Sequence, residues 1–235
     1  MKKIIPIFVP HQGCPHRCIF CHQPHITGVS LHTSITPDEI RNTIETALSE
    51  PKSQAKNIQF ELAFYGGTFT GLNFSIQEQF LHTAQSYVDH GNVTGIRIST
   101  HPAMFNERIF SLLHAFSVTT VELGVQSFDD DVLHYAKREH TAKEAKQTII
   151  RLQRSGIAVG IHLMVGLPGD SFEGSIQSTQ QAISLNPASV RIHPTLVIRH
   201  TQLAALYHAG QYEPLSLDAA VYTCKEMLKL FRMLK

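Results

Sequence analysis

The sequence predicts an α/β fold, a partial (β/α)6 TIM-like barrel, and three observations support this prediction. Short β-like runs alternate with longer helical runs six times, which is the pattern of parallel strands joined by crossover helices. The chain has 235 residues, 43% of them hydrophobic, which suffices for one sizeable core. Several strand candidates carry polar groups and glycines on one face. Such a face suits the inside of a barrel that holds a ligand, so we favour a barrel over an open doubly wound sheet.

The strand candidates are runs rich in β-branched and other apolar residues. They span residues 4–9, 58–65, 95–99, 118–125, 157–165 and 189–197. Because side chains alternate between the two faces of a strand, the later runs divide into an apolar face and a polar face. The polar face carries Glu122 and Gln126, then His162, then Arg191, His193 and Thr195. These groups are either satisfied core residues or the lining of a site. We favour a site, because sites in such folds lie at the carboxyl ends of the strands.

Capping residues mark the expected helix starts. Two capping boxes are predicted, at residues 36–39 with Pro37 in the first helical position, and at residues 75–78. The caps expected for the later helices are Asn106, Thr141, Ser171 and Ser216, and the expected stops are Pro51, Gly91 and Gly156. We find no internal repeat and no linker. The prediction is one domain over residues 1–235, and a longer parent protein with a further C-terminal segment stays an open alternative.

Composition gives weak information about partners and compartment. A formal net charge of +1 provides no electrostatic argument for nucleic acid or an anionic membrane. The apolar run near the N-terminus is too short for a signal peptide, and no run approaches the ~20 apolar residues of a membrane helix. The default compartment is therefore the cytoplasm. Thiols stay reduced there, which favours a metal over disulfides for clustered cysteines.

Three of the four cysteines lie within eight positions, directly after the first strand candidate. Cys14, Cys18 and Cys21 have the spacing C-x3-C-x2-C. Three thiolates can each hold one iron of a cubane cluster, and the fourth iron then has no protein ligand, as in a reactive open site. The alternative is structural zinc in a non-catalytic interaction module. Candidate fourth ligands for zinc are His11, His16, His22, His25 and Cys224, although Cys224 fits better as a buried residue on the apolar face of the last helix.

The cysteine spacing on this loop, with Phe20 just before the third cysteine, resembles the radical S-adenosylmethionine (SAM) superfamily. The resemblance extends to the radical SAM domain of the Elongator catalytic subunit and covers nearly the whole chain. The segments that carry it are Tyr65-Gly66-Gly67-Thr68, residues 121–127, residues 162–169 and residues 194–199. It implies a radical SAM barrel with a [4Fe-4S] cluster on the three cysteines. It also implies a SAM amino-group site at Gly66, Gly67 and Thr68.

The resemblance further implies that Ser99, Glu122, Gln126, His162 and Thr195 lie near the bound cofactor. The reaction implied is reductive cleavage of SAM to a 5′-deoxyadenosyl radical, with an external reductant of the flavodoxin or ferredoxin type. Transfer RNA is the implied substrate class, and porphyrinogen oxidation is the alternative. Two departures weaken a direct transfer of the reaction. We expect no acetyltransferase domain within residues 1–235, and Thr100-His101-Pro102-Ala103 replaces a family segment that carries an arginine and an acidic residue.

Overall fold

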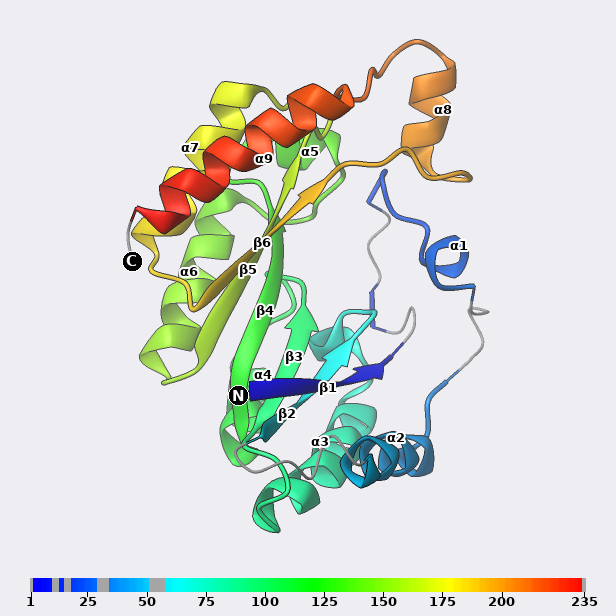
Figure 1. The fold of residues 1–235 in the computed structure, drawn as a ribbon, viewed down its shortest axis with the longest axis vertical. Helices are drawn as coiled ribbons and strands as arrows, with labels where there is room; N and C mark the ends of the chain where they lie inside the picture. Colours follow the sequence, from blue (N-terminus) through cyan, green and yellow to red (C-terminus); the bar gives the residue numbers. More distant parts are fainter. Residues whose placement is uncertain (1, 10–12, 15–17, 29–33, 51–57, 234–235) are drawn as a thin grey trace.

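The strands form one curled parallel sheet. The computed structural model describes residues 2–9, 13–14, 18–28, 34–50 and 58–233. The sheet runs in chain order through β1 (Lys2–Phe8), β2 (Gln59–Tyr65), β3 (Ile96–Thr100), β4 (Val118–Gln126), β5 (Ala158–Val165) and β6 (Ser189–Pro194). Every neighbouring pair is parallel, and in the described sheet β1 and β6 do not pair. The result is a half barrel that is open along one side (Figure 1), which confirms the predicted fold.

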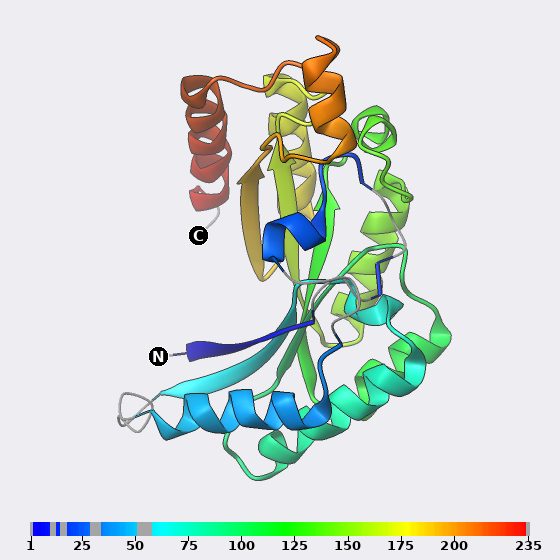
Figure 2. The ribbon, with the colours of Figure 1, turned by 90° about the vertical axis from the view of Figure 1, so that its right-hand side faces the viewer.

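The long helices cover the convex face of this sheet, as Figures 1 and 2 show. They are α2 (Pro37–Ser49), α3 (Phe74–Asp89), α4 (Glu107–Ala115), α6 (Ala142–Arg154), α7 (Phe172–Ser184) and α9 (Leu217–Arg232). Shorter elements lie towards the carboxyl ends of the strands and were not predicted. They are α1 (Gln23–Thr27), the 3-10 helix η2 (Phe69–Gly71), α5 (Asp130–Tyr135) and α8 (Gln202–His208).

The core lies between the sheet and the convex helices, because alternate strand residues point outward into it. Ile5, Ile7, Leu62, Phe64 and Val121 are all at most 2% exposed and belong to one apolar cluster. Burying each such side chain contributes about 1.5–3 kcal/mol. The residues between them face the hollow of the half barrel, and this face carries the charged groups described below.

Most predicted helix boundaries are correct. Thr36 and Thr141 form complete capping boxes, and the side chains of Asn106, Ser171 and Ser216 cap their helices as expected. The box at residues 75–78 is wrong. Asn73 is the cap of α3, and its Oδ1 accepts hydrogen bonds from the backbone N–H and the hydroxyl of Ser75, which therefore lies inside the helix.

Two of the three predicted stops can be compared with the structure. Gly91 and Gly156 follow α3 and α6 with positive φ values of 75° and 79°. Pro51 lies outside the described residues, as do His11 and His16.

The last helix, α9, differs from the expected pattern. It packs on α7, β5 and β6, and its buried residues are Thr223 and Met227. Cys224 is half-buried beside the core, whereas Val221 and Leu228, which belong to the apolar stripe of this helix in the sequence, are 57% and 46% exposed. The expectation fails because only a narrow face of α9 packs against the rest of the protein, whereas the apolar residues in its sequence cover a wider face.

Candidate functional site

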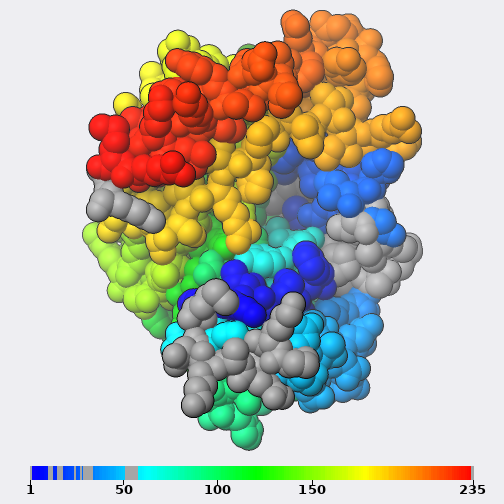
Figure 3. All heavy atoms as spheres, in the orientation of Figure 1, coloured from blue at the N-terminus to red at the C-terminus, as the bar shows by residue number. Residues whose placement is uncertain are grey.

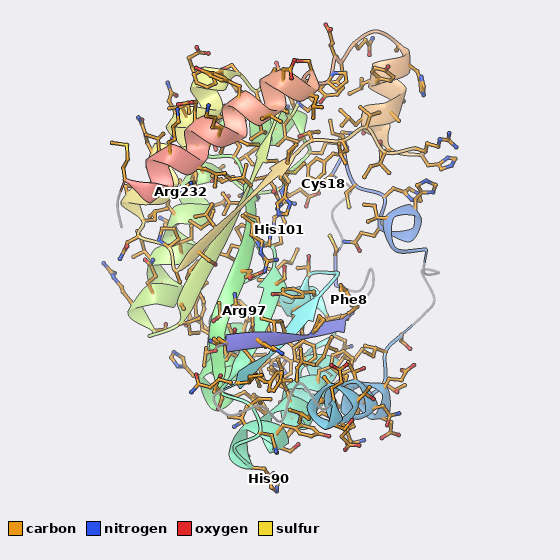
Figure 4. All side chains as sticks on the ribbon, viewed as in Figure 1. Phe8, Cys18, His90, Arg97, His101 and Arg232 are labelled. Atoms are coloured by element: carbon orange, nitrogen blue, oxygen red, sulfur yellow. The ribbon has the colours of Figure 1, made fainter. Side chains whose placement is uncertain are left out.

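The cysteine loop lies at the carboxyl edge of the sheet, where Figure 4 shows Cys18. Two backbone hydrogen bonds fix its centre: the N–H of Ile19 donates to the carbonyl of Ala136 after α5, and the Ile19 carbonyl accepts from Leu203 at the start of α8. Cys18 is 6% exposed, and Cys14 and Cys21 are partly exposed. Elements that are distant in sequence therefore hold the thiol loop in place.

A guanidinium group lies next to the most buried thiol. Nη1 of Arg138 is 3.1 Å from Sγ of Cys18, and Nη2 of the same side chain donates to the Gly124 carbonyl near the end of β4. This guanidinium places positive charge beside the sulfur and would balance the negative charge of a metal-binding thiolate. Arg138 thus connects the cysteine loop to strand β4 of the sheet.

The three thiols interact electrostatically with one another. The pKa of the Cys21 thiol is raised to about 11, by burial first and then by negative charge on Cys18 and Cys14, while Arg138 opposes these effects. Three neighbouring thiolates repel each other unless positive charge lies between them. Bound iron supplies such charge, so this donor set suits a metal cluster.

The loop after β2 packs against the residue that precedes the first cysteine. Gly66 has a φ of 91°, which favours glycine, and Thr68 is 5% exposed. Gly13, which precedes Cys14, lies against this loop so closely that an added Cβ atom would be 2.2 Å from the carbonyl oxygen of Thr68. The predicted Gly66-Gly67-Thr68 segment and the cysteine loop are therefore adjacent, as the proposed SAM site requires.

The hollow face of the sheet carries a ladder of alternating charges. Arg97 on β3 donates to the carboxylate of Glu61 on β2 at 2.7 and 3.0 Å and to that of Glu122 on β4 at 2.7 Å. Figure 4 shows Arg97 on the inner side of the sheet. The side chains of Glu61 and Glu122 are at most 1% exposed, so both charges depend on these partners.

Glu122 has two further partners on the following strands. Its Oε1 accepts from Arg191 on β6 at 2.9 Å, and its Oε2 lies 3.2 Å from Nε2 of His162 on β5. Burial alone would raise the pKa of Glu122. The hydrogen bond and charge of His162, the charge of Arg191 and the hydrogen bond from Arg97 hold the pKa below its usual value. Glu122 and His162 are thus brought together as expected, but the Glu122 carboxylate is occupied by protein groups.

The side chain of Arg191 also reaches across the hollow. Its Nη2 donates to the hydroxyl of Tyr65 at 3.1 Å, and its guanidinium lies 5.4 Å from the centre of that ring. The sixth strand is therefore connected to the second, across the open side of the half barrel. Figure 3 shows the hollow between the yellow-orange β6 segment and the dark blue β1 segment.

Two predicted site residues carry buried polar atoms that lack partners. Gln126, at the end of β4, has a φ of 71° and follows a shift in the β4–β5 register. Its Oε1 and the Oγ1 of Thr195 are buried and make no hydrogen bond among the described residues. Thr195 lies just past β6, held by a backbone bond to Val165. A buried polar atom without a partner is costly, so both oxygens are candidate contacts for a bound group at this rim.

The remaining predicted residues lie close to these. Ser99 on β3 is the register partner of Glu122 on the hollow face. Phe20 packs, with Met164, on a small apolar cluster formed by Val132, Ala136 and Leu167 under the cysteine loop. This packing of Phe20 anchors the cysteine loop.

Sequence reasoning missed Glu61, Arg97 and Arg138 as site residues. Alternation along β3 places Arg97 two residues before Ser99 on the same face, so a signal for Arg97 was present in the sequence. Nothing in the sequence pattern pairs Arg138 with Cys18, because 120 residues separate them. The alternative fourth thiol, Cys224, belongs to α9 on the convex side (Figure 2).

The fold and the site define a class of enzyme: a parallel half barrel with a three-thiol loop after its first strand. Family comparison gives the same class. Residues 8–177 match the radical SAM superfamily and residues 187–233 match the radical SAM C-terminal domain. The chain belongs to the radical SAM superfamily, whose members use a [4Fe-4S] cluster and SAM.

Individual relatives agree with this assignment. The chain is 25% identical over 255 residues to tRNA uridine(34) acetyltransferase of Methanocaldococcus jannaschii, covering 93% of this chain and 47% of that protein. It is 30% identical over 262 residues to Elongator complex protein 3 of Dictyostelium discoideum, covering 94% and 46%. This chain therefore spans about half the length of these relatives.

Solved structures share the fold. Elp3 of Methanocaldococcus infernus superposes with a TM-score of 0.73 at 22% identity, covering 96% of this chain and 53% of that one. Coproporphyrinogen III oxidase (HemN) of Escherichia coli superposes with a TM-score of 0.66 at 17% identity, covering 99% and 52%.

The residues present fit the cofactors of the family. Three neighbouring thiols match a cluster that each cysteine binds through a different iron, and the buried oxygens of Gln126 and Thr195 offer acceptors at the same rim. Among the described side chains, no three His, Cys, Asp or Glu are grouped around a single ion position. The fit therefore rests on the donor chemistry. No described helix is long and apolar enough to cross a membrane.

Proposed function

We propose that this enzyme cleaves SAM reductively at a cluster on Cys14, Cys18 and Cys21 and acts on RNA, with transfer RNA as the substrate class. The observation that carries the proposal is the cysteine loop at the carboxyl rim. The loop contacts Arg138, and at the same rim the buried oxygens of Gln126 and Thr195 make no hydrogen bond among the described residues. We treat residues 1–235 as one radical SAM core domain.

When bound, the cluster would supply one electron and SAM would supply a 5′-deoxyadenosyl radical for hydrogen abstraction, with methionine as the second product. The chain supplies position and charge. Gly66, Gly67 and Thr68 offer backbone groups beside the first cysteine, and Arg138 balances thiolate charge. Gln126 and Thr195 offer acceptors to a bound group.

In this proposal Glu122 and His162 position other side chains, whereas Gln126 and Thr195 contact the bound group. Because the Glu122 carboxylate is bonded to Arg97, Arg191 and His162, it fixes the three side chains that face the hollow. We assign Glu122 and His162 to positioning the floor of the site, with Ser99 beside them. A substrate or cofactor entering the hollow then meets the guanidinium of Arg191 and the ring of His193, both on β6.

The choice of RNA rests on the relatives. Proteins named for tRNA uridine(34) acetylation match most of this chain, and an Elp3 structure shares its fold. The chain covers about half of each of these proteins, so the tRNA reaction itself is part of the proposal. The proposal also includes an external electron donor of the flavodoxin or ferredoxin type, which reduces the cluster.

The test is anaerobic reconstitution with iron and sulfide, followed by assays for iron content and 5′-deoxyadenosine. We expect about four irons per chain and reductant-dependent 5′-deoxyadenosine. Cys18→Ala should lose both, and Cys224→Ala should retain both, because Cys224 lies on α9. A protein that binds one zinc tightly and never cleaves SAM would exclude the proposal. The active protein is then offered transfer RNA, and mass spectrometry of its nucleosides identifies any product.

A further inference from the structure

A second cavity lies outside the half barrel, on the other side of the loop that supports the first cysteine. Its volume is about 280 Å³, and it lies between η2, the start of α3 and the segment that joins β3 to α4. The residues that define it are Leu72, Phe74, Gln77, Met104, Phe105 and Arg108. This volume is slightly below the ~300–1,000 Å³ of typical small-molecule pockets, so it suits a group the size of one nucleobase.

Gln77, which lines the cavity, carries a buried hydrogen-bond acceptor without a partner among the described residues. Gln77 is 1% exposed, and its Nε2 donates to the carbonyls of Thr70 at 3.1 Å and Leu72 at 2.8 Å. These two bonds fix which end of the amide is the oxygen. That oxygen, Oε1, has no hydrogen-bond partner among the described residues. Because an unmet buried acceptor is costly, the site favours an occupant that presents an N–H donor.

A cation with free hydrogen-bonding capacity lies at the mouth of the same cavity. Arg108 is exposed, and its Cζ lies 3.5 Å from the centre of the Phe74 ring. The guanidinium forms no ion pair or hydrogen bond with a described residue, so its N–H groups are available to an anion. The caps of α3 and α4 are occupied by Asn73 and Asn106, so Arg108 is the group that would bind an anion here.

The walls between these two polar ends are apolar and partly aromatic. Phe74, Met104 and Phe105 are half-buried there, and Leu72 is buried. An occupant therefore has a flat apolar body, an N–H donor at its buried end and an anionic group at its exposed end. An unpaired nucleotide has this combination, and proteins recognise unpaired bases by stacking and by hydrogen bonds to base edges.

We propose that this cavity binds one unpaired RNA nucleotide whose base carries an exocyclic amino group, with the amine on Gln77 and the phosphate on Arg108. The RNA source rests on the proposed function. The cavity shares the Thr68–Leu72 segment with Gly13, which precedes Cys14, so a nucleotide bound here lies beside the cluster loop without occupying it. The site would hold a neighbour of the nucleotide that is modified.

The test measures binding of cytidine monophosphate to the anaerobically reconstituted enzyme with saturating SAM, so that the SAM site is filled. Uridine monophosphate is the matched ligand, because it replaces the amine by a carbonyl oxygen that would face Oε1 of Gln77. We expect cytidine monophosphate to bind at least fivefold more tightly than uridine monophosphate. Arg108→Ala should weaken it about tenfold, as expected for a lost charged hydrogen bond.

Arg151→Ala is the matched protein control. Arg151 also stacks on a phenylalanine, with its Cζ 3.8 Å from the centre of the Phe110 ring, but it does not line the cavity. This variant should bind cytidine monophosphate like the wild type. Equal affinity for both nucleotides, equal loss in both variants, or no binding up to roughly 10 mM would overturn the proposal.

A short single-stranded oligocytidylate distinguishes RNA from a free nucleotide. It should bind at least as tightly as the monophosphate and show the same loss with Arg108→Ala. Binding of the monophosphate alone would overturn the RNA assignment. SAM cleavage, measured on the same samples, separates the two proposals. Cleavage without nucleotide binding contradicts this site only, and nucleotide binding without cleavage contradicts the proposed function only.

Discussion

Nη1 of Arg138 lies 3.1 Å from Sγ of Cys18, although 120 residues separate the two in the chain. This contact brings a fixed positive charge against a ligand of the proposed cluster. Neighbouring charges and hydrogen bonds to the ligands tune the potential of a metal site. The first prediction follows from it.

Replacement of Arg138 by glutamine should make the cluster harder to reduce, because a positive charge near the cluster stabilises its more negative, reduced form. We expect a more negative midpoint potential in a spectroscopic redox titration and about tenfold slower formation of 5′-deoxyadenosine. Arg154→Gln, on the exposed end of α6, removes the same charge elsewhere and should change neither. An unchanged potential in Arg138→Gln would show that the contact has no electrostatic effect on the cluster.

Substitution of Gly13 by alanine should abolish cluster binding. The new Cβ atom would lie 2.2 Å from the Thr68 carbonyl oxygen and 2.6 Å from the Leu72 nitrogen, so the cysteine loop would have to move. The matched control is Gly91→Ala. Gly91 has nearly the same φ, 75° against 74°, but nothing within 4 Å of an added Cβ. The control should lose about 1 kcal/mol of stability and keep its iron. Equal iron content in both variants would contradict the steric argument.

Replacement of Arg97 by leucine should destabilise the fold strongly, because it leaves two buried carboxylates, on Glu61 and Glu122, without their shared partner. Breaking a buried ion pair from one side typically costs about 3–5 kcal/mol of unfolding free energy. Urea unfolding followed by circular dichroism measures it. The surface pair of Arg151 and Glu107 provides the comparison, and Arg151→Ala should cost less than about 1 kcal/mol. Similar losses of unfolding free energy in both variants would show that the buried charges of Glu61, Arg97 and Glu122 do not stabilise the fold more than a surface ion pair does.

Stability should fall in acid through the same ladder. Burial raises the pKa values of Glu61 and Glu122, but hydrogen bonds and charges from Arg97 and His162 outweigh it, so both pKa values lie below the ordinary value of 4.5. A carboxyl with a lowered folded-state pKa contributes stability above its unfolded pKa and loses it as the pH falls through the folded value. The contribution of these two carboxyls to the unfolding free energy should therefore be steady above about pH 4.5 and decline below it.

Glu122→Gln is the variant that tests this pH dependence. Its unfolding free energy should depend less on pH in the acid range than that of the wild type, because one titrating group with a lowered pKa is gone. Urea unfolding at a series of pH values gives both profiles. Parallel profiles would show that Glu122 is not a source of the acid sensitivity.

The sequence predicted much of this molecule because the local signals were strong. Six alternating runs became six parallel strands, each with its predicted start within two residues, since period-two alternation and capping residues act locally. The box at residue 75 failed because Asn73 is an equally good cap two residues earlier. The short elements at the rim, such as η2 and α5, escaped prediction because their contacts are with distant segments and not with their own neighbours.

The sequence by itself determined the three-thiol loop, its place after the first strand, and the polar inner face that carries Glu122, Gln126 and His162. Only the tertiary structure decided what these groups contact. It assigned the Glu122 carboxylate to Arg97, Arg191 and His162, and it left the Gln126 oxygen without a partner in the part of the chain that the structure describes. The physical reason is that alternation fixes the face on which a side chain lies. Its partner is fixed by the curl and register of a sheet whose strands are far apart in the chain.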